Sequence, residues 1–189
     1  MTAPFLEGKR LYLRGLSLED AEGAYPEWLN DEEVCRGNGH HLFPYGREQA
    51  REFIRGTWND RSAVTLAMVL REGHRHIGNV ALQGIHQIHR TAEFAILLGD
   101  RESWGQGYGR EAGLLLCRHG FRALQLHRVG CGTFADNEGM RGLARALGMK
   151  EEGRRRQAVW KDGRYVDVVE FGVLAEEFFE QFGHQGPKE

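Results

Sequence analysis

The chain has 189 residues, of which 41% are hydrophobic, and its 25 basic and 27 acidic side chains give a formal net charge of −2. This size and composition are typical of one globular domain that buries a core without disulfides or metal ions. Because the two signs of charge are balanced along the chain, electrostatics give no argument for binding nucleic acid or an anionic membrane.

The cysteine and histidine patterns argue against an exported, disulfide-bonded or metal-binding protein. Cys35, Cys117 and Cys131 are odd in number and form no CxxC pair. No stretch approaches the roughly 18 apolar residues of a membrane span, and the N-terminal segment lacks the apolar core of a signal peptide. The nine histidines show no familiar ligand spacing. We expect a cytoplasmic protein without a metal site.

The beginning of the chain predicts a strand and then a helix. Residues 10–16 alternate apolar and polar side chains, as a half-buried strand does. Ser17 stands three residues before Asp20 and serves as the N-cap of a predicted helix through about Tyr25. Pro26 is expected to interrupt that helix, and a short turn follows.

An amphipathic helix and an antiparallel meander come next. Residues 46–58 place apolar side chains at spacings of three and four, which is typical of an amphipathic helix. Three strands are then predicted over 63–71, 76–85 and 92–99, and the short segments between them are typical of hairpin turns. A three-stranded antiparallel meander is the simplest arrangement.

The second half of the chain completes the element order β-α-α-β-β-β-α-β-α-β-β. A helix between the fourth and fifth strands forms a crossover, which makes these two strands parallel. The order predicts an α/β fold with a mixed, mostly antiparallel sheet of about seven strands flanked by helices. The last elements are a helix over 110–124, a strand over 128–135, a helix over 136–149, strands over 150–161 and 164–175 joined by an Asp162-Gly163 hairpin turn, and a helical tail over 176–182.

The segment SWGQGYGREA, residues 103–112, places three glycines immediately before the long helix. A strand end, a glycine-rich turn and a helix N-terminus together form an anion site, because backbone N–H groups point outward and the helix dipole adds about half a positive charge. The alternative is a tight turn without a ligand. Arg110 and Glu111 stand where a Rossmann fingerprint or a Walker A loop requires other residues, so dinucleotide binding and nucleotide hydrolysis lose support.

These residues carry a family resemblance. The segments AEFAILLGDRESWGQGYGREA (92–112) and HRVGCGTFADN (127–137), with the helix ending RALGM (145–149), resemble the acyl-CoA-binding core of GNAT N-acetyltransferases. Within that superfamily the chain looks most like the Rim-type branch, which acetylates protein N-termini. The resemblance spans about residues 8–175 and implies one acetyltransferase domain over 1–189 with a short C-terminal tail. It implies acetyl-CoA as co-substrate and a primary amine as acceptor, and it leaves the oligomeric state open, a homodimer included.

The resemblance also implies which residues contact coenzyme A. The family's pyrophosphate loop corresponds to the segment from Trp104 to Gly109, with Trp104 where the family has Gln or Arg. The end of the fourth strand is implied to pair with the pantetheine arm as another strand would. Asn137 matches a pantetheine-binding asparagine and fits an N-cap equally well. The implied cofactor-binding residues are Ile96, Leu97, Leu98, Trp104, Gly105, Gln106, Gly107, Tyr108, Gly109, Arg110 and Asn137.

Glu93 is the candidate general base. It opens the fourth strand, where many members of the family carry a glutamate near the acceptor amine, and it could act through one water molecule. The alternative is an exposed strand glutamate that pairs with a cation. Ala144 and Met140 occupy the positions where related enzymes have a tyrosine or a serine as general acid, so no acid is assigned.

The acceptor is predicted from the chemistry of the amine. Trp28, Asn30 and Asp31 fall on the segment that borders the acceptor site in this family, although Trp28 also fits a core position. At neutral pH an α-amine, with a pKa near about 8, is deprotonated more often than a lysine amine near about 10.4, which favours a protein N-terminus. Amino sugars, aminoglycosides and polyamines stay open as acceptors. So does a non-catalytic acyl-CoA-binding sensor that has kept the fold.

Overall fold

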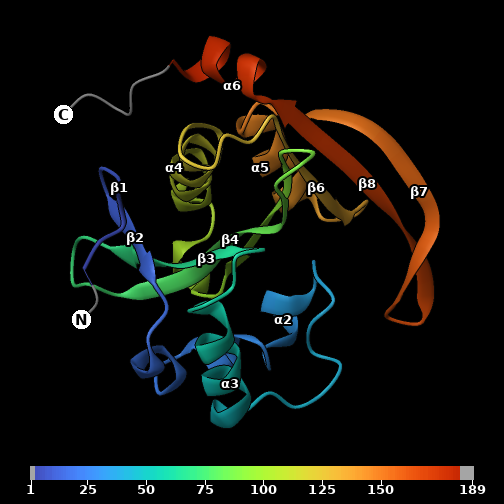
Figure 1. Ribbon diagram of the computed structural model, residues 1–189. Coiled ribbons are helices and arrows are strands. Elements are labelled where there is room, and N and C mark those ends of the chain that lie inside the picture. The colour runs from blue at the N-terminus through green and yellow to red at the C-terminus, as the bar shows by residue number, and fades with distance from the viewer. Residues whose placement is uncertain (1–2, 184–189) are drawn as a thin grey trace.

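One twisted sheet of eight strands runs through the molecule (Figure 1), and the structure, a computed structural model, describes residues 3–183. The strands are β1 (Leu6–Glu7), β2 (Leu11–Gly15), β3 (Val64–Leu70), β4 (His76–His86), β5 (Thr91–Leu98), β6 (Arg128–Phe134), β7 (Lys150–Lys161) and β8 (Arg164–Leu174). They lie side by side in the order β1-β2-β3-β4-β5-β6-β8-β7.

The pairing of the strands confirms the predicted mixed, mostly antiparallel sheet. Each neighbouring pair is antiparallel except β5 and β6, which are parallel as the crossover through the long helix requires. Asp162 and Gly163 both adopt positive φ angles at the β7–β8 turn, which is the backbone that an Asp-Gly hairpin favours. The strand beyond the predicted seven is the two-residue β1, which is too short to show an alternating pattern.

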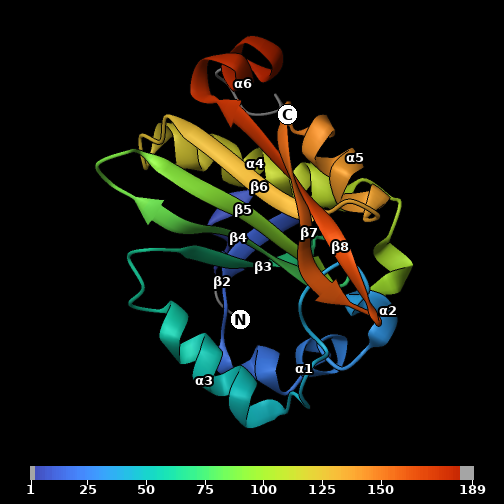
Figure 2. The ribbon, with the colours of Figure 1, turned by 90° about the vertical axis from the view of Figure 1, so that its right-hand side faces the viewer.

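Helices cover both faces of the sheet (Figure 2). They are η1 (Leu18–Ala21), α1 (Tyr25–Trp28), α2 (Glu32–Cys35), α3 (Arg47–Thr57), η2 (Arg101–Ser103), α4 (Tyr108–Arg122), α5 (Glu138–Ala146) and α6 (Ala175–Phe182), where η denotes a 3-10 helix. On one face the main core contains Leu116 of α4, Ala144 of α5 and Phe178 of α6. On the other face a second core contains Trp28 of α1 and Ile54 of α3.

The helix predicted from Ser17 to about Tyr25 begins where expected but is too long: Ser17 is the N-cap of η1, which ends at Ala21. Residues 18–21 form only the short η1, and Pro26 lies in the first turn of α1 instead of interrupting a helix. Proline is tolerated there because the N–H that it lacks would have no intrahelical partner. The segment that precedes α3 is therefore a series of single turns, each with its own start.

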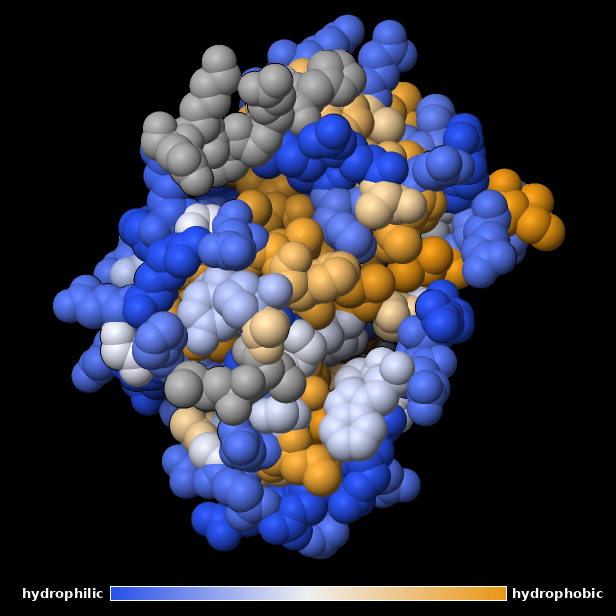
Figure 3. All heavy atoms as spheres, turned by 60° about the vertical axis from the view of Figure 1, so that its left-hand side comes forward, coloured by the Kyte–Doolittle hydropathy of each residue, from blue (hydrophilic) through white to orange (hydrophobic). Residues whose placement is uncertain are grey.

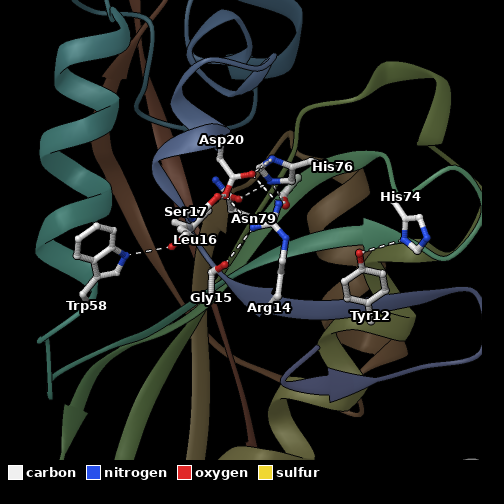
Figure 4. Close-up of polar contacts among 11 residues, drawn as sticks. Tyr12, Arg14, Gly15, Leu16, Ser17, Asp20, Trp58, His74, His76 and Asn79 are labelled. Atoms are coloured by element: carbon white, nitrogen blue, oxygen red, sulfur yellow. Dashed lines mark hydrogen bonds and ion pairs between the residues drawn. The ribbon is translucent and has the colours of Figure 1, made fainter. Parts of the chain in front are cut away.

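A buried polar cluster fixes this segment to the sheet (Figure 4). Arg14 at the end of β2 donates two hydrogen bonds to the Asp20 carboxylate, at 2.8 and 2.6 Å. Nδ1 of His76 lies 3.3 Å from the same carboxylate, and Nε2 of His76 lies 2.9 Å from Oδ1 of Asn79. The Asp20 side chain is 5% exposed. The cluster thus joins η1 to β2 and β4.

Replacing Asp20 with asparagine is expected to lower the free energy of unfolding at neutral pH by about 3–5 kcal/mol. The change leaves the guanidinium of Arg14, whose side chain is 12% exposed, without its buried counter-charge. Urea unfolding at pH 7 measures the loss. Asp60→Asn is the control, because Asp60 is an exposed carboxylate that accepts from Ser62 and has no basic partner within residues 3–183, and its unfolding midpoint should stay close to that of the wild type.

The same carboxylate predicts a pH dependence of stability. Burial alone would raise the pKa of Asp20, but hydrogen bonds from Arg14, His76 and the Ser17 backbone outweigh it and hold the pKa well below its usual value. Because the folded-state pKa is lowered, this contribution is present above the unfolded pKa of about 3.9 and is lost as the pH falls below it. The stability difference between the wild type and Asp20→Asn should therefore shrink when urea unfolding is repeated at acid pH. A difference that stays constant would contradict the assignment.

Hydrophobic side chains reach the surface on the face shown in Figure 3, where they gather near the centre and hydrophilic residues border them. Partly buried Leu6 of β1 and Leu114 and Leu115 of α4 pack against the main core.

Of the helices formed by residues 3–183, none is long and apolar enough to cross a membrane.

Candidate active site

A cavity of about 1610 Å³ opens where β5 and β6 separate. Their parallel register ends at Glu93 and Gly130, although β5 continues to Leu98 and β6 to Phe134. Beyond that point β5 stays paired with β4, and β6 stays paired with β8. Each strand follows its own antiparallel neighbour, so a wedge is left between them.

The edge of β5 that faces this wedge carries backbone groups without a strand partner. Gly99 donates its N–H to the carbonyl of Ile77 on β4, and backbone groups of alternate residues in a strand point to the same side. Leu97 therefore faces β4, whereas the N–H and C=O of Ile96 face the wedge. An extended ligand lying in the wedge could form strand-like hydrogen bonds with Ile96.

The glycine-rich loop lies along the same cavity and leads into α4. Gly105 and Gly107 have φ angles of +71° and +80°, in the left-handed region that other residues disfavour. The helix begins at Tyr108, two residues earlier than predicted, so both glycines precede it. Gly107 is the N-cap, and no side chain caps the helix. The first N–H groups of a 15-residue helix are thus left without side-chain partners, as an anion site requires.

Most of the residues implied by the family resemblance meet in this cavity. Gln106 is the exception, because its carbonyl accepts from Nη1 of Arg10 at 2.8 Å and its side-chain amide donates to the carbonyl of Glu102, both outside the cavity lining. Among the residues implied by the resemblance, those that line the cavity are Glu93, Ile96, Leu97, Leu98, Trp104, Gly105, Gly107, Tyr108, Gly109, Arg110 and Asn137.

Trp104, which stands where the family has Gln or Arg, makes a hydrogen bond that gives this side chain a structural role. Its indole Nε1 donates to the carbonyl of Leu98 at 2.7 Å, which ties the loop to the end of β5. The guanidinium of Arg101 lies 6.0 Å from the indole ring and also contacts Asp31 at 3.4 Å. The loop is therefore linked through Arg101 to α2 on the other side of the cavity.

Glu93 is exposed at the point where the two strands part. It lies directly opposite Gln83 in the β4–β5 register, and both side chains line the cavity. Within residues 3–183 no hydrogen bond or ion pair occupies the Glu93 carboxylate. The geometry places a carboxylate beside the wedge, within reach of an amine or a water molecule that enters it.

The Asn137 side chain is occupied at both ends. Its Oδ1 accepts from the backbone N–H of Met140 at 3.0 Å, which caps α5. Its Nδ2 donates to the carbonyl of Gly37, after α2, at 3.0 Å. The structure contains the N-cap bond of Asn137, and the second N–H of Nδ2 is not used by the bond to Gly37, so a contact with pantetheine stays a prediction.

The three candidate acceptor contacts have different surroundings. Trp28 is 8% exposed and packs against Gly99, where a Cβ would overlap the indole, so it belongs to the core. Asn30 joins two loops by hydrogen bonds with the backbone of Pro26 and Tyr45. Of the three, Asp31 lines the cavity, and it caps α2 by accepting from the backbone N–H groups of the next turn.

Residues of the β7–β8 hairpin line the cavity although the sequence did not single them out. Lys161, at the tip of the hairpin, has a side chain that is 16% exposed and donates to the carbonyl of Cys35 at the end of α2, at 3.4 Å. Arg155 lies further along β7 and binds Glu170 at 2.7 Å. Figure 2 shows the hairpin tip beside α2. No local pattern predicts this contact, because 126 residues separate Lys161 from Cys35.

Acidic side chains of the cavity are mostly paired with basic ones. Asp31 contacts Arg101, and Glu33 and Arg36 form an ion pair one turn apart on α2. Asp136 is paired with Arg164, Glu138 with Arg141, and Asp162 lies 4.0 Å from Lys161. Of the carboxylates that line the cavity, Glu32 and Glu93 have no basic partner within residues 3–183. The same part of the chain contains no group of three or more His, Cys, Asp or Glu side chains arranged to hold a metal ion.

Residues 10–150 match the family model of the acetyltransferase (GNAT) domain. The chain belongs to the GNAT acetyltransferase family. This GNAT protein is 31% identical over 175 residues to the uncharacterized N-acetyltransferase p20 of Bacillus licheniformis, and the alignment covers 90% of this chain and 96% of the relative.

Solved structures share the same GNAT fold. Spermidine N-acetyltransferase from Vibrio cholerae, in complex with CoA and spermine, superimposes with a TM-score of 0.82 at 23% identity over 91% of this chain and 99% of that one. RimL, the ribosomal L7/L12 alpha-N-protein acetyltransferase in complex with coenzyme A, gives a TM-score of 0.80 at 19% identity over 88% and 95%. The chain is thus a GNAT-type N-acetyltransferase, a member of a family that uses acetyl-CoA.

Proposed function

We propose that this GNAT N-acetyltransferase transfers the acetyl group of acetyl-CoA to the α-amine of a protein or peptide N-terminus, as the Rim-type branch does. We base the choice of acceptor on the ion pairs that most carboxylates of the cavity form with basic side chains. A polyamine holds several positive charges at neutral pH and needs several unpaired carboxylates around it. Here Asp31, Glu33 and Asp136 already have arginine partners. Within residues 3–183 the lining carboxylates that lack a basic partner are Glu32 and Glu93, so the cavity suits an acceptor with fewer positive charges than a polyamine.

In this proposal coenzyme A lies with its pyrophosphate on the glycine-rich loop and its pantetheine arm in the wedge between β5 and β6. The uncapped start of α4 supplies N–H donors and the positive end of a helix dipole. Ile96 offers a strand-like N–H and C=O to the pantetheine amides, and Arg110 at the start of α4 adds a positive charge at the cavity wall. The thioester then comes to rest near Glu93, where the strands part.

The chemistry proposed is direct attack. The Glu93 carboxylate accepts a proton from the amine, directly or through a water molecule, and the amine nitrogen attacks the thioester carbonyl carbon. A backbone N–H beside the wedge stabilises the oxyanion that forms. The carbon–sulfur bond then breaks, and the coenzyme A thiolate, whose thiol has a pKa near about 8.5, leaves and takes up a proton from solvent. No residue of the chain becomes acylated.

The acceptor is tested by measuring the release of free coenzyme A from acetyl-CoA over a panel of peptides, spermidine, an aminoglycoside and an amino sugar. We expect release with peptides that have a free α-amine and none with the same peptides blocked at the N-terminus. Release with spermidine alone would overturn the peptide proposal, and the Vibrio cholerae spermidine enzyme shows that this fold admits such an acceptor. Tight binding of acetyl-CoA without release on any acceptor would favour a sensor.

A further inference from the structure

Arg10 contacts the glycine-rich loop from the side that does not line the cavity. It directly precedes β2, nearly 100 residues from the loop in the chain, and its Nη1 donates to the carbonyl of Gln106 at 2.8 Å. Its guanidinium also lies 4.6 Å from the centre of the Tyr108 ring, in cation–π contact with the first residue of α4. The loop is therefore held at the two positions that flank Gly107.

The same arginine binds the acidic residue in the first turn of α4. Nε of Arg10 donates to Oε2 of Glu111 at 2.9 Å, and the backbone N–H of Arg10 donates to Oε1 at 2.8 Å. The backbone N–H of Leu11 lies 3.4 Å from Oε1. The Glu111 side chain is 16% exposed, so its carboxylate is turned toward the start of β2 and away from solvent.

Glu111 poses an electrostatic problem for an anion site. A carboxylate in the first turn of a helix is favourable for the helix dipole, but it repels a phosphate bound at the same N-terminus. The contacts with Arg10 remove this conflict, because they neutralise the carboxylate and hold it on the side of α4 that faces β2.

We propose that Arg10 is a positioning residue for the coenzyme pyrophosphate. It holds the Gln106 carbonyl on the side of the loop that does not line the cavity, and it neutralises the charge of the Glu111 carboxylate. The inference rests on the proposed function, since it takes the glycine-rich loop to be the pyrophosphate site. Because the C=O and N–H of one trans peptide point in opposite directions, the bond from Arg10 to the Gln106 carbonyl turns the N–H of Gly107 away from Arg10 and toward the cavity that Gly107 lines. With Glu111 paired, the positive end of α4 is left for the ligand.

Replacing Arg10 with alanine is expected to raise the KM for acetyl-CoA about tenfold and to leave kcat unchanged. The KM for acetyl-pantetheine, which lacks the pyrophosphate, should not change. Arg71→Ala is the matched control, because Arg71 is an arginine on the same sheet edge that binds Glu7 and the carbonyl of Gly8 but does not contact the loop. Arg10→Lys keeps the charge without the fork of donors and should fall between the wild type and Arg10→Ala.

A double variant separates charge from simple loss of structure. If Glu111 repels the pyrophosphate once Arg10 is gone, Arg10→Ala with Glu111→Gln should bind acetyl-CoA more tightly than Arg10→Ala alone. A purely structural role predicts no gain in affinity, because the glutamine oxygen can still accept from the backbone N–H groups at the start of β2. Thermal unfolding of each variant shows which of them are folded, and the folded variants carry the comparison.

The outcomes distinguish this inference from the function on which it rests. An Arg10→Ala variant with normal KM for acetyl-CoA, or equal effects on acetyl-CoA and acetyl-pantetheine, would contradict the role of Arg10 alone. If the wild-type protein instead has the same kcat/KM for acetyl-pantetheine as for acetyl-CoA, the glycine-rich loop does not bind the pyrophosphate.

Discussion

Replacing Gly107 with valine is expected to weaken acetyl-CoA binding about 100-fold, while the free energy of unfolding falls by only about 1–2 kcal/mol. Gly107 has a φ of +80°, and an L-residue with a side chain strains that backbone by about 1–2 kcal/mol. The strain turns the loop N–H groups away from the pyrophosphate. The loss of about one charge-assisted hydrogen bond corresponds to the expected drop in affinity. Isothermal titration with acetyl-CoA and urea unfolding measure the two quantities.

Gly73→Val is the control for backbone strain. Gly73 has a φ of +69° in the turn between β3 and β4, with open space around it and no place in the cavity lining. It should lose a similar amount of stability and keep its affinity for acetyl-CoA. Normal binding by Gly107→Val would mean that the loop is only a turn.

Replacing Glu93 with glutamine is expected to lower kcat about 100-fold at neutral pH and to leave the affinity for acetyl-CoA unchanged. The amide keeps the shape of the side chain but cannot accept the amine proton, and general-base catalysis contributes about 100-fold or more. The affinity is preserved because Glu93 lies where the strands part, whereas the glycine-rich loop, which we propose binds the pyrophosphate, follows the far end of β5. Steady-state turnover across a pH series and titration with acetyl-CoA make the comparison.

Glu48→Gln is the matched control for this change. Glu48 is a glutamate on α3 whose side chain is 75% exposed and which lies outside the cavity lining. Its kcat should equal that of the wild type. Unchanged turnover of Glu93→Gln at every pH would exclude Glu93 as the base. Glu32, the other lining carboxylate without a basic partner within residues 3–183, would then be the next residue to replace.

The sheet was predictable because its signals are local and strong. Alternating strands, the Asp162-Gly163 turn and the crossover through α4 each specify a pairing that the structure contains. The segment between β2 and α3 was not predictable in the same way. Pro26 is compatible with both the end and the beginning of a helix, and the choice was decided by burial of Tyr25 and Trp28 in the second core.

The candidate site was predictable where it is continuous in the sequence. The end of β5 and the glycine-rich loop follow one another along the chain, so a family pattern could find this part of the cavity lining. Arg10 and Lys161 reach the site from the two ends of the chain, and only the folded sheet brings them to the loop and to α2. No periodicity or short motif marks such contacts. The ion pairs on which we base the choice of acceptor, such as Asp31 with Arg101 and Asp136 with Arg164, also join residues that are far apart in the sequence.

The position of the transferred acetyl group tests the central proposal most directly. A peptide with a free α-amine and an internal lysine would be incubated with the protein and acetyl-CoA, and tandem mass spectrometry would locate the acetyl group. We expect acetylation of the α-amine, dependent on Glu93 and on an intact glycine-rich loop. Acetyl on the lysine side chain, or on spermidine added in competition while the peptide stays unmodified, would contradict it.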